Sequence, residues 1–235
     1  MINSIYEAAK NLHLKTKNID IVSNNLANLN SIGYKRQLPF AEIMSRIDLA
    51  DRNHLTDFSE GSFIQTGNPL DFAVSGSGFL VYETENGLEL SKNGKLTISD
   101  DGFLINENGL KLLGESGAIQ IMDDLHVSGK SLTVSRNGEV RVGDKVVDKL
   151  LVGKITDAAS VIRANNQNFV IKESNLTVAE EEDFAVYQSA LEESNVNPFT
   201  EMQSLIELNK NFETTQKMVG YFDNHLSKVN EVGKV

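Results

Sequence analysis

Few residues of this sequence have the types and spacing that a binding or catalytic site requires. Gly76-Ser77-Gly78 follows a predicted strand and resembles the start of a dinucleotide-binding turn, in which glycines let the backbone approach a pyrophosphate. No helix is predicted after it, and Val81 occupies the place of the third glycine. A turn between two strands explains these glycines better, so we predict no cofactor.

The titratable side chains form no catalytic or metal-binding pattern either. Only one of the histidines, His54, has carboxylates at a helical spacing, Asp51 and Asp57, and no apolar period predicts a helix there. Asp100-Asp101-Gly102 lacks the alternating oxygen ligands of a calcium loop. The acidic run Glu180–Asp183 is typical of a solvated loop. We therefore predict no metal site and no enzyme.

The composition limits the partners that the chain can have. A net charge of −11 would repel nucleic-acid backbones and anionic membrane surfaces. No apolar run approaches the roughly 20 residues of a membrane-spanning helix, and 40% hydrophobic residues exclude wholesale disorder. The first residues lack the apolar core of a secretory signal, and the absence of cysteine excludes disulfides. We expect neither nucleic-acid binding nor membrane insertion.

A long amphipathic helix is predicted at the C-terminal end, from Pro198 to about Val229. Apolar residues recur there with the heptad spacing of a coiled coil. Pro198 suits a first helical turn, and Glu201 places a negative charge near the positive end of the helix dipole. The a positions are Leu205, Phe212, Val219 and Leu226, and the d positions are Leu208, Thr215, Phe222 and Val229.

A matching helix is predicted at the N-terminal end. Ser4 and Glu7 have the spacing of a capping box, and Lys15 interrupts the otherwise apolar companion positions. The seam residues are Ile5, Leu12, Ile19 and Leu26, with Ala8, Val22 and Leu29. Each seam could be one face of an ordinary core helix, but two seams at opposite ends favour a coiled-coil-like pairing of the helices.

The first helix ends in an amide-rich patch, with asparagines at positions 24, 25, 28 and 30, before Gly33. Asparagine weakens helices, so the patch could be a solvated, fraying end. It could equally form hydrogen bonds to neighbouring chains in an assembly, because asparagine offers donors and acceptors without charge.

The middle of the chain is predicted to be antiparallel β structure. Fourteen of the seventeen glycines lie between Gly61 and Gly153, and turn pairs such as Asn108-Gly109 separate short apolar runs. We predict an α+β fold, in which a β-rich middle domain is inserted between the two helices. Residues 1–35 and 199–235 would form a terminal helical assembly domain, 69–183 the β-rich domain, and 36–68 and 184–198 connectors, with a possible short helix at Phe40–Leu49.

Several of these residues also match a known family. The chain resembles the bacterial flagellar axial proteins, those of the rod and hook, nearly throughout its length and in the family's order. Two departures, Asn11-Leu12 in the first helix and Ser91-Lys92 in the middle, concern the subtype. The matching residues are Ser23–Asn28 with Gly33-Tyr34-Lys35; Leu70–Val74 with Gly76, Gly78 and Phe79; and Leu191-Glu192, Ser194–Val196, Glu201-Met202 and Phe212-Glu213.

The resemblance implies a structural subunit of the flagellar basal-body rod, packed helically around a hollow axis that transmits torque and encloses an export channel. It implies export without a cleaved signal, a location in the rod that crosses the periplasm, and other rod and hook subunits and the export apparatus as partners. The short chain is more similar to a proximal rod subunit than to a distal rod or hook subunit.

Two other functions stay open from the residues alone: an export-associated chaperone or cap that binds axial proteins, and a carbohydrate-active enzyme with an acidic cleft. For a rod subunit, we predict that the seams and the amide patch form the assembly interface. Its predicted residues are Ile5, Leu12, Ile19, Asn24, Asn25, Leu26, Asn28, Gly33, Leu205, Leu208, Phe212, Val219, Phe222 and Leu226.

Overall fold

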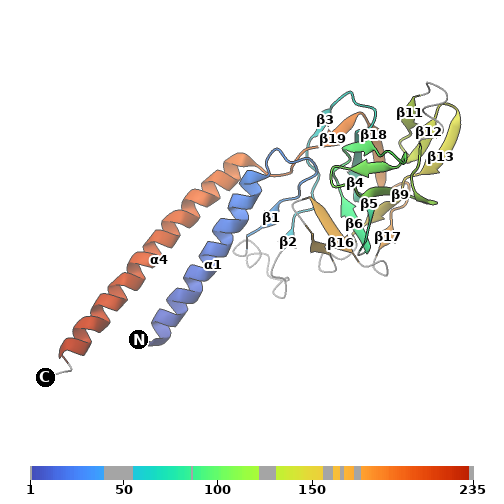
Figure 1. Cartoon of the computed structure of the whole chain (residues 1–235). Helices are drawn as coiled ribbons and strands as arrows, with labels where there is room; N and C mark the ends of the chain where they lie inside the picture. The colour runs from blue at the N-terminus through green and yellow to red at the C-terminus, as the bar shows by residue number, and fades with distance from the viewer. Residues whose placement is uncertain are drawn as a thin grey trace. The chain divides into compact units, whose positions relative to one another are not determined.

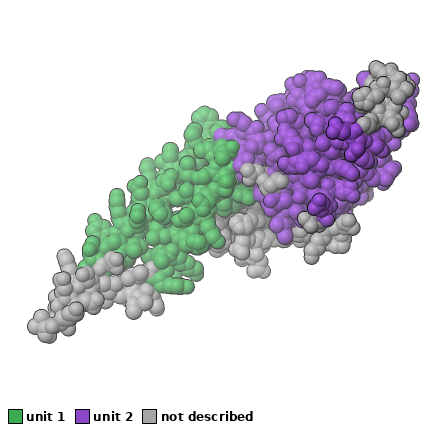
Figure 2. All heavy atoms as spheres, viewed as in Figure 1, with its two compact units in different colours: residues 1–27, 37–55, 197–235 green, residues 28–36, 56–196 purple. Residues whose placement is uncertain are grey.

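A computed structural model of the chain describes residues 2–39, 55–85, 87–121, 131–155, 161–164, 167–171 and 176–232 (Figure 1). The chain divides into two compact units (Figure 2). Unit 1 comprises residues 1–27, 37–55 and 197–235, and unit 2 comprises residues 28–36 and 56–196. The short helix predicted at Phe40–Leu49 lies outside the described residues.

Unit 1 contains two long helices, α1 (Ile2–Ala27) and α4 (Pro198–Val232), which lie side by side (Figure 1). Helix α4 begins at Pro198, as the sequence predicts. Its N-terminus is capped by the Asn197 side chain, whose Oδ1 accepts hydrogen bonds from the backbone N–H of Phe199 at 3.0 Å and of Thr200 at 3.3 Å. The short strand β1 (Gln37–Leu38) pairs with β2 (Leu55–Thr56).

The predicted α+β fold with a coiled-coil-like domain is wrong: the described chain is mostly β, with two helices and no coiled coil. A coiled coil needs apolar a and d side chains that interlock along both helices. Here Lys15, at a d position of α1, donates hydrogen bonds to the carbonyl of Asn211 at 3.0 Å and to Oγ1 of Thr215 at 2.7 Å. On α4, Phe222 remains 38% exposed, and Leu205, Leu208, Phe212 and Val219 are only half-buried.

Unit 2 is built from short antiparallel strands, in agreement with the part of the prediction that concerned the middle of the chain. Its largest sheet has the order β15-β16-β6-β5-β9-β8-β7, with β10 on β9, and β14 joining β5 to β17. A three-stranded sheet, β11-β12-β13, and the pairs β18-β4 and β19-β3 complete it. The strands are β3 (Phe63–Gln65), β4 (Phe72–Gly76), β5 (Gly78–Thr84), β6 (Gly87–Ser91), β7 (Leu96–Ile98), β8 (Leu104–Asn106), β9 (Lys111–Gly114), β10 (Gly117–Ala118), β11 (Leu132–Val134), β12 (Glu139–Val142), β13 (Lys145–Lys149), β14 (Val152–Lys154), β15 (Ile162–Arg163), β16 (Asn168–Ile171), β17 (Thr177–Val178), β18 (Phe184–Gln188) and β19 (Ala190–Glu192).

Strand β5 organises the interior of unit 2 because it is buried on both faces. Alternate side chains of a strand point to opposite faces of the sheet. Leu80 and Tyr82 belong to one apolar cluster, which includes Phe72, while Phe79 and Val81 belong to a second. The buried Tyr82 hydroxyl donates a hydrogen bond to the carbonyl of Asn93 at 2.8 Å. Val74 of the first cluster and Phe79 of the second also contact Lys92, which belongs to the site described next.

Candidate functional site

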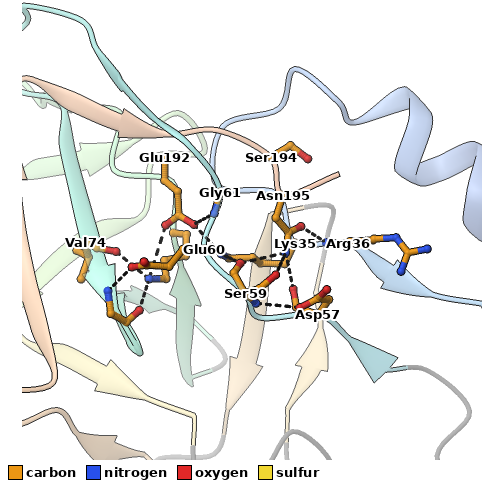
Figure 3. Close-up of polar contacts among 12 residues, drawn as sticks. Lys35, Arg36, Asp57, Ser59, Glu60, Gly61, Val74, Glu192, Ser194 and Asn195 are labelled. Carbon is orange, nitrogen blue, oxygen red and sulfur yellow. Dashed lines mark hydrogen bonds and ion pairs between the residues drawn. The ribbon is translucent and has the colours of Figure 1, made fainter. Parts of the chain in front are cut away.

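A buried ion pair joins two segments of unit 2 that are far apart in the sequence (Figure 3). Lys35 lies in the segment that follows α1, and Glu192 ends β19, in the segment that precedes α4. Lys35 Nζ is 2.6 Å from Glu192 Oε1, and neither side chain has any solvent exposure. The same Lys35 ammonium donates a hydrogen bond to the carbonyl of Ser59 at 2.6 Å. The backbone N–H of Gly61 donates to Glu192 Oε1 at 2.9 Å, so one carboxylate holds two separate segments.

A second buried cation stands beside the same carboxylate. Lys92 Nζ is 3.6 Å from Glu192 Oε2, a distance too long for a hydrogen bond. Its protons are donated to the carbonyls of Val74 at 2.8 Å and Gly76 at 2.9 Å, and the ammonium lies 5.1 Å from the centre of the Phe79 ring. Burial lowers the pKa of Lys92 to about 8, and the nearby Glu192 carboxylate opposes that shift.

Hydrogen bonds of the Asn195 side chain, together with one between backbones, hold the two segments together around the ion pair. Asn195 Oδ1 accepts a hydrogen bond from the backbone N–H of Arg36 at 2.7 Å, while Asn195 Nδ2 donates to the carbonyls of Asp57 at 2.9 Å and Ser59 at 3.0 Å. Figure 3 shows these contacts converging on one asparagine. The N–H of Gly33 donates to the carbonyl of Glu192 at 2.7 Å.

Gly33 occupies a position that other residues would not fit. Its φ is +68°, and a Cβ built there would lie 2.4 Å from the backbone nitrogen of Asn93. Both the left-handed conformation and the close approach to Asn93 therefore require glycine.

A second polar contact, within unit 1, connects the ends of the two helices. Asn25 is fully buried, and its Nδ2 donates to Glu201 Oε2 at 3.1 Å and to the carbonyl of Gln37 at 2.8 Å. Its Oδ1 accepts a hydrogen bond from the Gln37 N–H at 2.9 Å. Glu201, in the first turn of α4, is also fully buried. Asn25 thus links the last turns of α1 to the first turn of α4.

The structure places the predicted assembly residues in different environments. The amide-patch residues Asn25 and Asn28 are buried, and Asn28 Oδ1 accepts a hydrogen bond from the Ser31 hydroxyl at 2.9 Å, whereas Asn24 is exposed. Gly33 is buried in unit 2. The seam residues lie on α1 and α4: Leu12, Ile19, Leu26, Leu205, Leu208, Phe212 and Val219 are half-buried, Phe222 is exposed, and the side chains of Ile5 and Leu226 are outside the described part. Their contact with neighbouring subunits stays a prediction.

Sequence reasoning missed the ion pair, although Lys35, Glu192 and Asn195 all stand in the motifs that carry the family resemblance. The usable signal was a lysine and a glutamate inside two matching motifs at opposite ends of the chain. Nothing in their local spacing pairs them, because 157 positions separate Lys35 from Glu192.

The charged atoms of the site are buried, and most of them make hydrogen bonds. The Lys35 and Lys92 ammonium groups donate to backbone carbonyls, and Glu192 Oε1 accepts from the backbone N–H of Gly61. Glu192 Oε2 makes no hydrogen bond to the described residues and faces Lys92 Nζ at 3.6 Å. Within the described residues, no group of three or more histidine, cysteine, aspartate or glutamate side chains could hold a metal ion. In the same part of the chain, no helix is long and apolar enough to cross a membrane.

Two parts of the sequence match known protein families. Residues 73–142 match the family described as flagellar hook protein FlgE/F/G D1 domain. Residues 187–232 match the family described as flagellar basal body rod FlgEFG protein C-terminal. The first range contains Lys92, and the second contains Glu192, Asn195 and Glu201, so both matches include residues of the buried contacts.

Rod proteins match over nearly the whole chain, whereas a hook protein matches over less than half of it. The flagellar basal-body rod protein FlgF of Mesorhizobium japonicum is 26% identical over 227 residues, which cover 93% of this chain and 92% of the relative. FlgF of Caulobacter vibrioides is 27% identical over 239 residues, covering 93% of each chain. The flagellar hook protein FlgE of Escherichia coli is 32% identical over 114 residues, but these cover 46% of this chain and 28% of the hook protein. Similarity to rod proteins is therefore global, and similarity to the hook protein is partial.

Proposed function

The chain belongs to the family of flagellar rod and hook proteins and is a structural subunit of the basal-body rod, and from this premise we propose how it performs that role. Copies of the chain assemble helically into a hollow shaft that transmits torque and encloses an export channel. Its partners are other copies of itself, other rod and hook subunits, and the flagellar export apparatus. The shaft crosses the periplasm, and the chain has no catalytic activity.

The observation that carries this proposal is the buried pair of Lys35 and Glu192. A rod subunit must pass force between its helices and its β-rich part without unfolding. The pair fastens the segment that follows α1 to the segment that precedes α4, within unit 2. Because removing one partner of a buried pair costs about 3–5 kcal/mol, the two segments resist separation. A catalytic site would instead need at least one such charge exposed to a substrate.

We further propose a proximal position in the rod. The chain has 235 residues and a modest β-rich part, which is more similar to the shorter rod subunits than to a hook subunit. The partial match to a hook protein, against nearly complete matches to rod proteins, supports the rod over the hook.

Isolation of basal bodies from cells that produce a tagged chain tests the function. The tagged wild-type chain should copurify with basal bodies, and Lys35→Ala should be depleted from them. Lys95→Ala is the matched control, because Lys95 forms an exposed pair with Glu107 at 2.7 Å and should be incorporated normally. A wild-type chain that stays in the soluble fraction while basal bodies form normally would contradict the proposal.

A further inference from the structure

An uncharged groove lies on unit 2, beside the edge strand β3. Among the described strands, β3 pairs only with β19, so its second edge is open. Phe63, Ile64 and Tyr187 are each about 40% exposed or slightly less, and the Phe63 and Tyr187 rings are 6.0 Å apart. The groove is lined by Phe63, Ile64, Gln65, Ser75, Tyr187, Gln188 and Ala190.

The groove suits a side chain better than a metabolite. Its volume is about 280 Å³, at or below the smallest small-molecule sites, which begin near 300 Å³. None of its lining residues carries a charge that could orient a polar ligand. On a chain with a net charge of −11, an uncharged surface is where a second acidic molecule meets the least repulsion.

The same chain exposes a stripe of apolar side chains, which a groove of this kind would shield from water. On the first turns of α4, Phe199 is 80% exposed, Met202 45% and Ile206 57%. Their spacing of three and four residues puts them on one face of the helix, a different face from the half-buried residues Leu205, Leu208 and Phe212. The stripe spans about 10 Å at 1.5 Å per residue, a length suited to a short groove.

The charged residues beside the groove and beside the stripe have opposite signs. Arg136 is exposed, and its guanidinium lies 5.7 Å from the centre of the Tyr187 ring, at the rim of the groove. Glu207 is exposed and directly follows Ile206 on α4. A helix seated by its stripe could therefore bring a glutamate to a rim arginine, which sets the orientation more than the affinity.

We propose that the stripe Phe199–Met202–Ile206 of one copy of this chain docks into the groove at Phe63, Ile64 and Tyr187 of a second copy. The two surfaces are different patches, so the contact is heterologous and leaves a free groove and a free stripe at the two ends of every pair. Repetition of such a contact produces a ring where the rotation between copies closes and an open helical array where it does not, and the proposed rod requires the helical array. The inference rests on the proposed function and names the surfaces by which copies meet.

The chain has no cysteine, so introduced cysteines report on single contacts. Cells would co-produce Ile64→Cys and Met202→Cys, one with a larger tag, and their isolated basal bodies would be oxidised. The expected result is a mixed disulfide dimer in clear excess over both self dimers. Ile98→Cys replaces Ile64→Cys in the control, because Ile98 is a similarly exposed apolar residue, 38%, on β7. A mixed yield no higher than that of the control would overturn the inference.

Incorporation and cross-linking are read from the same preparation, which separates the two claims. Variants that enter basal bodies without forming the mixed dimer would leave the rod function intact and refute the docking surface. Absence of the wild-type chain from basal bodies would refute the function itself. As an independent readout, Arg136→Glu and Glu207→Arg should each reduce incorporation, and the double variant should restore it; failure of the double variant, with both singles impaired, would contradict the proposed orientation.

Discussion

At the scale of single residues, unit 2 is held by charged side chains that water does not reach. Glu192 meets Lys35 at 2.6 Å and Lys92 at 3.6 Å, and all three side chains are buried. Desolvation makes a buried ion pair a poor source of net stability, but it makes the loss of one partner expensive. The three residues should therefore respond to substitution very differently from charged residues at the surface.

Lys35→Ala should reduce the free energy of unfolding of unit 2 by about 3–5 kcal/mol, because it leaves Glu192 buried without its closest cation. The exposed pair Lys95–Glu107 provides the comparison, and Lys95→Ala should change stability by about 0–1 kcal/mol. Denaturant unfolding followed by the β signal in circular dichroism measures both. Equal, small effects for the two variants would show that the buried pair does not hold the segments together.

Lys92 should make stability depend on pH in an unusual direction. Its pKa is about 8 in the folded chain and 10.5 ordinarily, so between these values the unfolded state binds more protons. Stability attributable to Lys92 should therefore rise as the pH increases from about 8 to 10.5, and stay at its lower level below pH 8. A shift of this size corresponds to about 3 kcal/mol.

Comparison with Lys92→Met isolates this contribution, because methionine cannot titrate. Lys95 and Lys149 have raised pKa values and lose stabilising contacts at high pH, but they do so in both proteins. The wild type should gain stability relative to Lys92→Met across pH 8–10.5. A constant difference over that range would mean that Lys92 titrates normally.

At the scale of elements, the ends of the helices and the turn after α1 are fixed by polar contacts rather than by an apolar seam. Asn25 forms hydrogen bonds to Gln37 and Glu201, whereas the sequence pattern pointed to leucines and isoleucines. The sequence does contain apolar residues at heptad spacing. This spacing alone does not predict whether two helices interlock along their full length. Lys15, at a d position, hydrogen-bonds to α4 instead of interlocking with it.

Asn25→Ala should lower the stability of unit 1 by about 1–3 kcal/mol, since it removes the hydrogen bonds that this fully buried side chain makes to Gln37 and Glu201. Asn209→Ala, at an exposed position of α4, should have little effect. Helical circular dichroism during denaturant unfolding measures the loss. If Asn25→Ala and Asn209→Ala unfold at the same denaturant concentration, the hydrogen bonds of Asn25 do not stabilise unit 1.

The turn after α1 offers a second matched pair of substitutions. Gly33 and Gly67 both have positive φ, of 68° and 74°, but only Gly33 faces a close backbone neighbour. Gly67→Ala should cost roughly 1–2 kcal/mol through its conformation alone. Gly33→Ala should cost clearly more, because its Cβ would collide with Asn93. Indistinguishable unfolding midpoints for the two variants would contradict the close approach at Gly33.

At the scale of the whole molecule, local signals predicted local structure and little else. The turns Asp101-Gly102, Asn108-Gly109 and Asn137-Gly138 connect antiparallel neighbours, as their sequences indicate. Asn93-Gly94 does not form a hairpin: the Gly94 carbonyl accepts a hydrogen bond from the Phe72 N–H, and a Cβ at Gly94 would overlap the Phe72 carbonyl oxygen. Turn residues specify local backbone shape, whereas which strands become neighbours depends on distant contacts.

The site was even less accessible to local reasoning. The family motifs identified the segments around Lys35 and Glu192, but only folding reveals that the two side chains share one buried position. The predicted assembly residues stay predictions because they concern copies of the chain in contact, and the predicted domain boundaries also stay predictions. They are best tested in the assembled rod.

The most direct test of the account is a cryo-electron microscopy map of purified basal bodies at side-chain resolution. We expect the chain at helically repeated positions in the rod, with density joining Lys35 to Glu192 in every copy. Rod density that is fully accounted for by other proteins, with this chain absent, would contradict its assignment as a rod subunit.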